Sequence, residues 1–159
     1  MCARRGLRAE KGQVLLMIYL IAGCPLSGKT TLARELSHHT KIPCISTDDL
    51  SILFSYYTGY SLFGSGNYYQ YYESSPSEKI QQDHLSYQTE IGKMLVHFLN
   101  SKIAQEEDLI MEGFALSPHV INELPRDQTQ LICLVMEEPL LRQRYCAVNN
   151  FSRKKEDIL

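Results

Sequence analysis

Eight consecutive residues, Gly23 to Thr30, have the types and spacing of a phosphate-binding loop. They read Gly-Cys-Pro-Leu-Ser-Gly-Lys-Thr, which fits the pattern GxxxxGK[ST]. The two glycines allow backbone conformations that let successive N–H groups converge on phosphate oxygens. Lys29 is expected to reach the β- and γ-phosphates of a nucleoside triphosphate, and the Thr30 hydroxyl to ligate Mg²⁺. The predicted nucleotide-binding residues are Gly23, Cys24, Pro25, Leu26, Ser27, Gly28, Lys29, Thr30 and Thr31.

Two acidic segments further along the chain supply groups that phosphoryl transfer uses. Asp48 and Asp49 follow a short apolar segment, and Glu112 ends another. An aspartate beyond the carboxyl end of a parallel strand can accept a proton from an attacking hydroxyl. Asp48 is therefore predicted as the base and, with Asp49, as a substrate contact. Glu112 is predicted to hold Mg²⁺ together with Thr30. The predicted catalytic residues are Lys29, Asp48 and Glu112.

Each of these residues also has an ordinary structural interpretation. A glycine-rich turn can join a strand to a helix without binding phosphate. Either aspartate can cap a helix that starts at Leu50, and Glu112 can be the polar end of a strand. We expect Asp48 to face the chemistry and Asp49 to cap or orient the helix.

Basic residues near the C-terminus are candidates for a lid over the phosphates. Cations that close over a transferring phosphoryl group stabilise its developing charge. Arg144 and Arg153 are the lid candidates; a solvated charged surface is the equal alternative. The basic residues in this part of the chain are Arg142, Arg144, Arg153, Lys154 and Lys155.

A parallel α/β sheet would bring these segments together. Apolar runs of strand length alternate with segments of helical periodicity, which predicts parallel strands joined by right-handed crossovers. The expected fold is that of a P-loop NTPase, with about four strands flanked by helices. Strands are expected at 14–22, 42–46, 108–112 and 131–136, and helices at 30–39, 50–57, 78–105, 118–124 and from 139.

The length of 159 residues suits one domain. We expect a flexible lead-in at 1–13 and a kinase-like domain at 14–159. Residues 57–77, rich in tyrosine and glycine, are expected to form a long loop. Residues 56–78 contain no lysine or arginine, so this tyrosine-rich segment does not resemble an RNA-binding surface.

Composition narrows the partners and the compartment. A net charge of -2 argues against a nucleic-acid partner. Five cysteines without a CxxC pair suggest reduced thiols and a cytoplasmic protein. The basic N-terminal residues, the apolar run and Gly23-Cys24 also resemble a lipoprotein signal. Cleavage there would destroy the loop, and the motif that continues through Thr30 favours phosphate binding. The run is too short to span a bilayer, so no membrane partner is expected.

The motifs together resemble the P-loop kinase group of 2-phosphoglycerate kinases, zeta toxins and polynucleotide 5'-kinases, and 2-phosphoglycerate kinase most of all. The resemblance covers residues 14–145. It rests on the loop, on Ser-Thr-Asp-Asp at 46–49, on a glutamine-containing helix at 84–88 and on Glu-Gly at 112–113. It implies ATP and Mg²⁺ as cofactors. It also implies a small phosphorylated or carboxylated acceptor.

The chain departs from this group at several positions. Ser51 stands where a substrate-binding arginine or lysine is usual, Ala115 where a histidine is expected, and Val148 where a further lid arginine is expected. A closing helix and a fifth strand are not apparent before Leu159. These departures leave two alternatives open: a truncated or degenerate protein that binds nucleotide without efficient catalysis, as an interaction or regulatory module, and a kinase of nucleic-acid or nucleoside 5'-hydroxyls.

Overall fold

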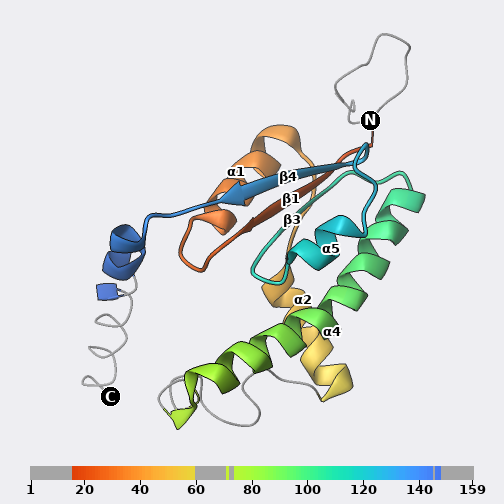
Figure 1. The fold of residues 1–159 in the computed structure, drawn as a ribbon. Helices are drawn as coiled ribbons and strands as arrows, with labels where there is room; N and C mark the ends of the chain where they lie inside the picture. The colour runs from red at the N-terminus through yellow and green to blue at the C-terminus, as the bar shows by residue number, and fades with distance from the viewer. Residues whose placement is uncertain (1–15, 60–70, 72–73, 145, 148–159) are drawn as a thin grey trace, which may run out of the picture.

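A four-stranded parallel sheet forms the centre of the described protein (Figure 1). The computed structural model describes residues 16–59, 71, 74–144 and 146–147. The sheet has the order β2-β3-β1-β4, and every pairing is parallel. The strands are β1 (Ile18–Gly23), β2 (Cys44–Ser46), β3 (Leu109–Glu112) and β4 (Thr129–Leu134). The predicted α/β fold with parallel strands flanked by helices is confirmed.

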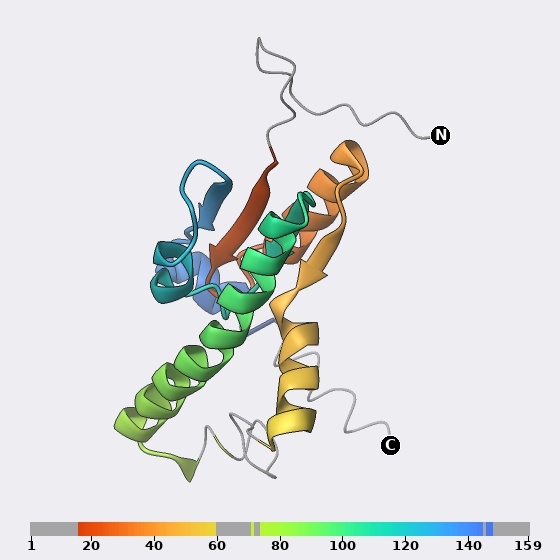
Figure 2. The same cartoon turned by 90° about the vertical axis from the view of Figure 1, so that its right-hand side faces the viewer.

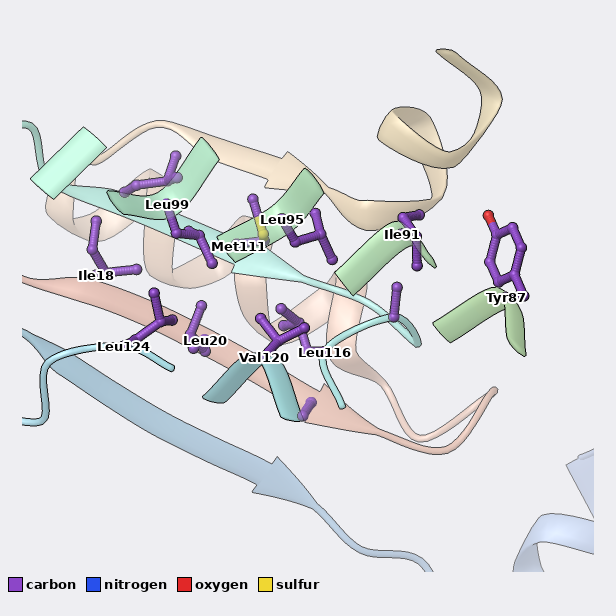
Figure 3. Close-up of a cluster of buried hydrophobic side chains, with 13 residues drawn as sticks. Ile18, Leu20, Tyr87, Ile91, Leu95, Leu99, Met111, Leu116, Val120 and Leu124 are labelled. Atoms are coloured by element: carbon purple, nitrogen blue, oxygen red, sulfur yellow. The ribbon is translucent and has the colours of Figure 1, made fainter. Parts of the chain in front are cut away.

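The two central strands are buried because helices cover both faces of the sheet. The helices are α1 (Lys29–Thr40), α2 (Thr47–Thr58), α4 (Ser77–Ala104) and α5 (Pro118–Asn122). On one face α1 packs Ala33 against Ile21 and Ile110. On the other face α4 and α5 bury the main core against β1 and β3 (Figure 3). This core includes Ile18, Leu20, Ile91, Leu95, Leu99, Met111 and Val120, all fully buried.

The strand β4 lies at one side of the described sheet and is less buried than its sequence suggests. It begins at Thr129 rather than Leu131 and ends at Leu134. Only β1 pairs with it, so Leu131 remains 40% exposed. An apolar run therefore does not by itself distinguish a central strand from this one.

The helix α2 begins three residues earlier than predicted. Ser46 is its N-cap, and the Ser46 side chain accepts a hydrogen bond from the Asp48 N–H at 3.2 Å. The expectation that Asp49 caps this helix is wrong, because the serine hydroxyl already fills that role. Asp48 and Asp49 instead lie in the first turn of α2, where their negative charges interact favourably with the helix dipole.

Several expectations fall outside the described residues. These are the lead-in at 1–13, most of the 57–77 segment, Arg153 and the residues after 147. In the described part of the chain, no helix is long and apolar enough to cross a membrane.

Candidate functional site

The predicted phosphate-binding loop joins the end of β1 to the start of α1. Gly23 has φ 144°, and a Cβ on it would lie 2.4 Å from the Leu134 carbonyl oxygen. Gly28 is the N-cap of α1 with φ 95°, a conformation that strains other residues. Both glycines of the motif are thus required by the backbone path, one for close packing on β4 and one for the turn.

Lys29 turns its ammonium group back into the loop. The residue is only 8% exposed, and Nζ donates a hydrogen bond to the Cys24 carbonyl oxygen at 2.7 Å. An ammonium group has three donors, so this bond leaves two for other oxygens. Lys29 is therefore positioned to bind phosphate at the mouth of the loop.

Further donors converge on the same place. The Ser27 hydroxyl is buried and has no hydrogen-bond partner among the described residues. Gly28 provides no side-chain cap, so the first-turn N–H groups of α1 are not satisfied by an N-cap side chain. A buried hydroxyl and a helix N-terminus are groups that an anion would satisfy. The loop can therefore hold an anion such as a phosphate group.

The Thr30 hydroxyl and the Glu112 carboxylate lie together beside the loop. Thr30 Oγ1 donates to Glu112 Oε1 at 3.1 Å, and Glu112 is only 3% exposed. Two neighbouring ligands of an octahedral Mg²⁺ lie about 3 Å apart when each bond is about 2.1 Å long. Both oxygens are hard donors at the matching separation, so the pair fits a magnesium site.

The charge of Glu112 also acts on a neighbouring thiol. Burial raises the pKa of Cys44, and the Glu112 carboxylate raises it further, while Arg34 acts in the opposite direction. Cys44 is therefore held in its neutral form beside the acid. A neutral thiol adds no competing charge to the site.

Asp48 and Asp49 lie at the same edge of the sheet, beyond β2. Ser46 pairs in register with Glu112, which places the start of α2 beside the end of β3. Both aspartates are exposed. No hydrogen bond or ion pair links either side chain to the loop within the described residues, so they are available to a ligand.

The structure places Arg144, one of the two lid candidates, against the loop. Nη1 of Arg144 donates to the Leu26 carbonyl oxygen at 2.7 Å, across 118 residues of sequence. Arg144 lies in a helical segment at 138–144 that follows β4. A hollow of about 350 Å³ is lined by Leu26, Gly28, Lys29, Thr30, Thr31 and Arg144. The other lid candidate, Arg153, is outside the described residues.

Thr47 belongs to the Ser-Thr-Asp-Asp segment at 46–49, but the sequence motifs gave it no role of its own. It is fully buried, and a Cβ on Gly113 would lie 1.8 Å from its hydroxyl oxygen. This contact sets the spacing between the start of α2 and the end of β3. Gly113, which follows Glu112, is the sequence signal for this contact, because so close an approach to the backbone leaves no room for a side chain.

Two of the three positions that depart from the kinase group, Ser51 and Ala115, have structural roles, and the third, Val148, is outside the described residues. The Ser51 hydroxyl donates to the Thr47 carbonyl oxygen at 2.6 Å, within α2. Ala115 is 2% exposed and belongs to the main core. Neither side chain is therefore directed to the chemistry that the resemblance assigns to its position.

A second hollow lies between α2 and α4, whose ends far from the sheet diverge in Figure 2. Its volume is about 830 Å³, within the range of small-molecule sites. The lining is mostly uncharged: Phe54, Thr58, Leu85, Ser86, Thr89 and Glu90.

Next to this hollow on α4, His84 packs edge-on against Phe114, with ring centroids 5.5 Å apart. Burial lowers the pKa of His84, and Asp83 opposes that effect. The imidazole is thereby favoured in its neutral form. A neutral His84 adds no positive charge to the α4 side of the hollow.

No protein-family model matches the sequence, and no curated protein is significantly similar to it. Solved structures are similar to the chain at low sequence identity, among them the following two. A sugar kinase from Janibacter sp. HTCC2649 is 15% identical with a TM-score of 0.53, over 82% of this chain and 66% of that chain. A protein provisionally named a kinase, from Chloroflexus aurantiacus J-10-fl, is 16% identical with a TM-score of 0.48, over 87% and 70%.

The likeness to the sugar kinase supports a shared fold. The lower TM-score of the second structure supports nothing further. The chain spans about two thirds of the length of both proteins, 66% and 70%.

Proposed function

We propose that this protein binds Mg-ATP at residues 23–31 and transfers the γ-phosphoryl group to a hydroxyl of a small molecule. The observation that carries the proposal is the contact of Thr30 with Glu112, 3.1 Å from oxygen to oxygen. It supports the proposal because a hydroxyl and a carboxylate oxygen suit Mg²⁺, and the neighbouring loop offers a lysine and a helix N-terminus that suit phosphate.

The residues have distinct parts in this proposal. Bound Mg-ATP would supply the transferable phosphoryl group and a cation over its oxygens. Lys29 would exchange the Cys24 carbonyl oxygen for phosphate oxygens, and Arg144 would close over them from the other side. Asp48 would accept the proton that the acceptor hydroxyl loses as its oxygen bonds to phosphorus.

Two classes of acceptor, charged and uncharged, differ in the cations that they need from the protein. The resemblance to 2-phosphoglycerate kinase favours a phosphorylated or carboxylated molecule. Such an acceptor needs cations, yet residues 42–78 contain no lysine or arginine. On α4, Lys79 contacts Asp83, and Lys93 contacts Glu90 at 2.8 Å. An uncharged hydroxyl compound, such as the sugar implied by the name of the Janibacter protein, suits this charge distribution better.

A second candidate function is nucleotide binding without efficient transfer. The positions of Ser51 and Ala115 favour it, because one side chain is tied to its own helix and the other is in the core. Under this proposal the protein would be an interaction or regulatory module that uses nucleotide as its ligand.

Thermal unfolding with and without Mg-ATP tests the binding step. A ligand that binds only the folded protein raises its melting temperature. We expect a rise for the wild type and for Lys93→Ala, an exposed control, and no rise for Lys29→Ala. The absence of a rise in the wild type, or an equal rise in Lys29→Ala, would contradict the proposed site.

Release of ADP from ATP then separates the two candidate functions. Sugars, phosphorylated sugars and hydroxy acids are added as acceptors to the wild-type protein. Stimulated ADP release with one acceptor supports the kinase and names its class. If Mg-ATP raises the melting temperature but no acceptor stimulates the release of ADP from ATP, the result supports the nucleotide-binding module instead.

A further inference from the structure

Three potential metal ligands gather on the exposed end of α1 that lies away from the loop. Glu35, His38 and His39 have the spacing i, i+3 and i+4, which places them on neighbouring positions of one helical face. Their ligand atoms all lie within 4.8 Å of one another. Glu35 Oε2 is 3.9 Å from His39 Nε2, and the two imidazole rings meet edge-on with centroids 5.5 Å apart.

We propose that Glu35, His38 and His39 bind a divalent transition-metal ion of the Zn²⁺ or Ni²⁺ type. Two imidazole nitrogens with one carboxylate oxygen are a donor set that such ions favour. Ligands about 2.1 Å from a tetrahedral ion lie about 3.4 Å apart. The side chains need to move by about 1 Å to reach that separation, and they are exposed enough to do so through small rotations.

The backbone under these side chains is fixed. The Lys41 N–H donates to the Ser37 carbonyl oxygen at 2.8 Å and closes the helix. The Ser37 hydroxyl bonds to the Ile42 carbonyl oxygen at 2.6 Å, and the Thr40 hydroxyl to that of Leu36 at 2.7 Å. Binding would therefore order only side chains, which lowers its entropic cost.

The electrostatic surroundings act in both directions. The C-terminal end of a helix carries a partial negative charge, which attracts a cation. The Glu35 carboxylate adds a full negative charge, while Lys41 at the helix end opposes it. These two full charges are opposite and equal, and the partial negative charge of the helix end adds an attraction for the ion.

This site is separate from the proposed magnesium pair. His38 follows Thr30 by eight residues, which is about 12 Å along the helix axis. The pair at Thr30 and Glu112 offers only oxygen ligands, which suit Mg²⁺. The imidazoles of the α1 end prefer softer ions. The metal site is therefore independent of nucleotide binding, and its test does not rest on the proposed function.

Titration with Co²⁺ tests the site and separates it from the cysteines. The full chain is titrated while heat of binding and the absorption spectrum are recorded. Nitrogen and oxygen ligands give weak visible bands, whereas thiolate ligands add a strong near-ultraviolet charge-transfer band. We expect one bound ion per chain without the thiolate band. No binding, or binding accompanied by that band, overturns the proposal.

Variants assign the binding to its residues. We expect the affinity for Co²⁺ to fall by about tenfold or more in each of the variants His38→Ala, His39→Ala and Glu35→Gln. Removing a ligand should cost at least as much affinity as removing a group that only orients a ligand. His97→Ala, which changes an exposed histidine of α4, is the control and should bind as the wild type does. The side chains are exposed, so melting temperatures without metal should agree. Wild-type affinity in the double variant His38→Ala/His39→Ala overturns the assignment.

Discussion

The hydroxyl of Thr30 lies 3.1 Å from the carboxylate of Glu112, although 82 residues separate them in the chain. Thr30 belongs to the first turn of α1, and Glu112 is the last residue of β3. They meet because β1 and β3 pair in parallel, with Ile21 opposite Glu112. The candidate phosphate-binding loop and Glu112 therefore lie next to each other.

Replacing either member of this pair should remove the effect of magnesium on nucleotide binding. Thr30→Val keeps the side-chain shape and removes the hydroxyl, and Glu112→Gln removes the charge. We expect ATP affinity in Mg²⁺ to fall by about tenfold, the scale of one lost charge-assisted contact, to the Mg²⁺-free value. Calorimetric titration with and without Mg²⁺ measures it. Thr40→Val, at the far end of α1, is the control; unchanged magnesium dependence in Thr30→Val would contradict the site.

Asp48→Asn should reduce phosphoryl transfer while nucleotide binding persists. Loss of a general base lowers turnover by about 10² to 10⁴-fold. The side chain is exposed, so stability should change by less than about 1 kcal/mol, through its place in the first turn of α2. Asp49→Asn, one residue along the same turn, should retain far more turnover. Steady-state ADP release measures both; full turnover in Asp48→Asn would exclude Asp48 as the base.

Arg144→Ala should weaken nucleotide binding with little effect on the fold. The guanidinium contacts only the Leu26 carbonyl oxygen in the described structure, and the residue is exposed. Losing a charged donor to phosphate should raise the KM for ATP by about tenfold or more. Arg142→Ala is a matched control, since Arg142 bonds to Glu138 on the same segment. Equal KM values in the two variants would remove Arg144 from the lid.

Gly113→Ala should destabilise the protein strongly. The residue has φ 144°, and the new Cβ would lie 1.8 Å from Thr47 Oγ1. Steric overlap and backbone strain together should lower the free energy of unfolding by at least about 2 kcal/mol. Gly59→Ala has open space around it and should cost about 1 kcal/mol. Urea denaturation compares the two, and equal losses would refute the close approach of Thr47.

Stability should fall in mildly acidic solution because of His84. Burial lowers the pKa of His84 below its unfolded value of 6.5, so protons bind the unfolded state more readily. The part of the free energy of unfolding that depends on a neutral His84 is fully present above pH 6.5. It is lost as the pH falls through the lower pKa of the folded state. Urea denaturation across this range should show a smaller decrease for His84→Gln than for the wild type. Identical pH profiles would contradict this.

The sequence alone predicted the general fold and located the candidate phosphate-binding loop. The loop is a local motif, and its glycines, Lys29 and Thr30 act through backbone geometry within eight residues. The alternation of apolar runs and helical periods likewise follows from local patterns, so the strands β1 and β3 were placed within a few residues.

The tertiary structure decided the relations between segments. Strand order placed β3 beside β1, which joined Glu112 to Thr30, and the path after β4 brought Arg144 to Leu26. Competition between neighbouring groups made Ser46, not Asp49, the cap of α2. Such contacts depend on which elements pack together, and hydrophobic periodicity records only which face of each element is buried.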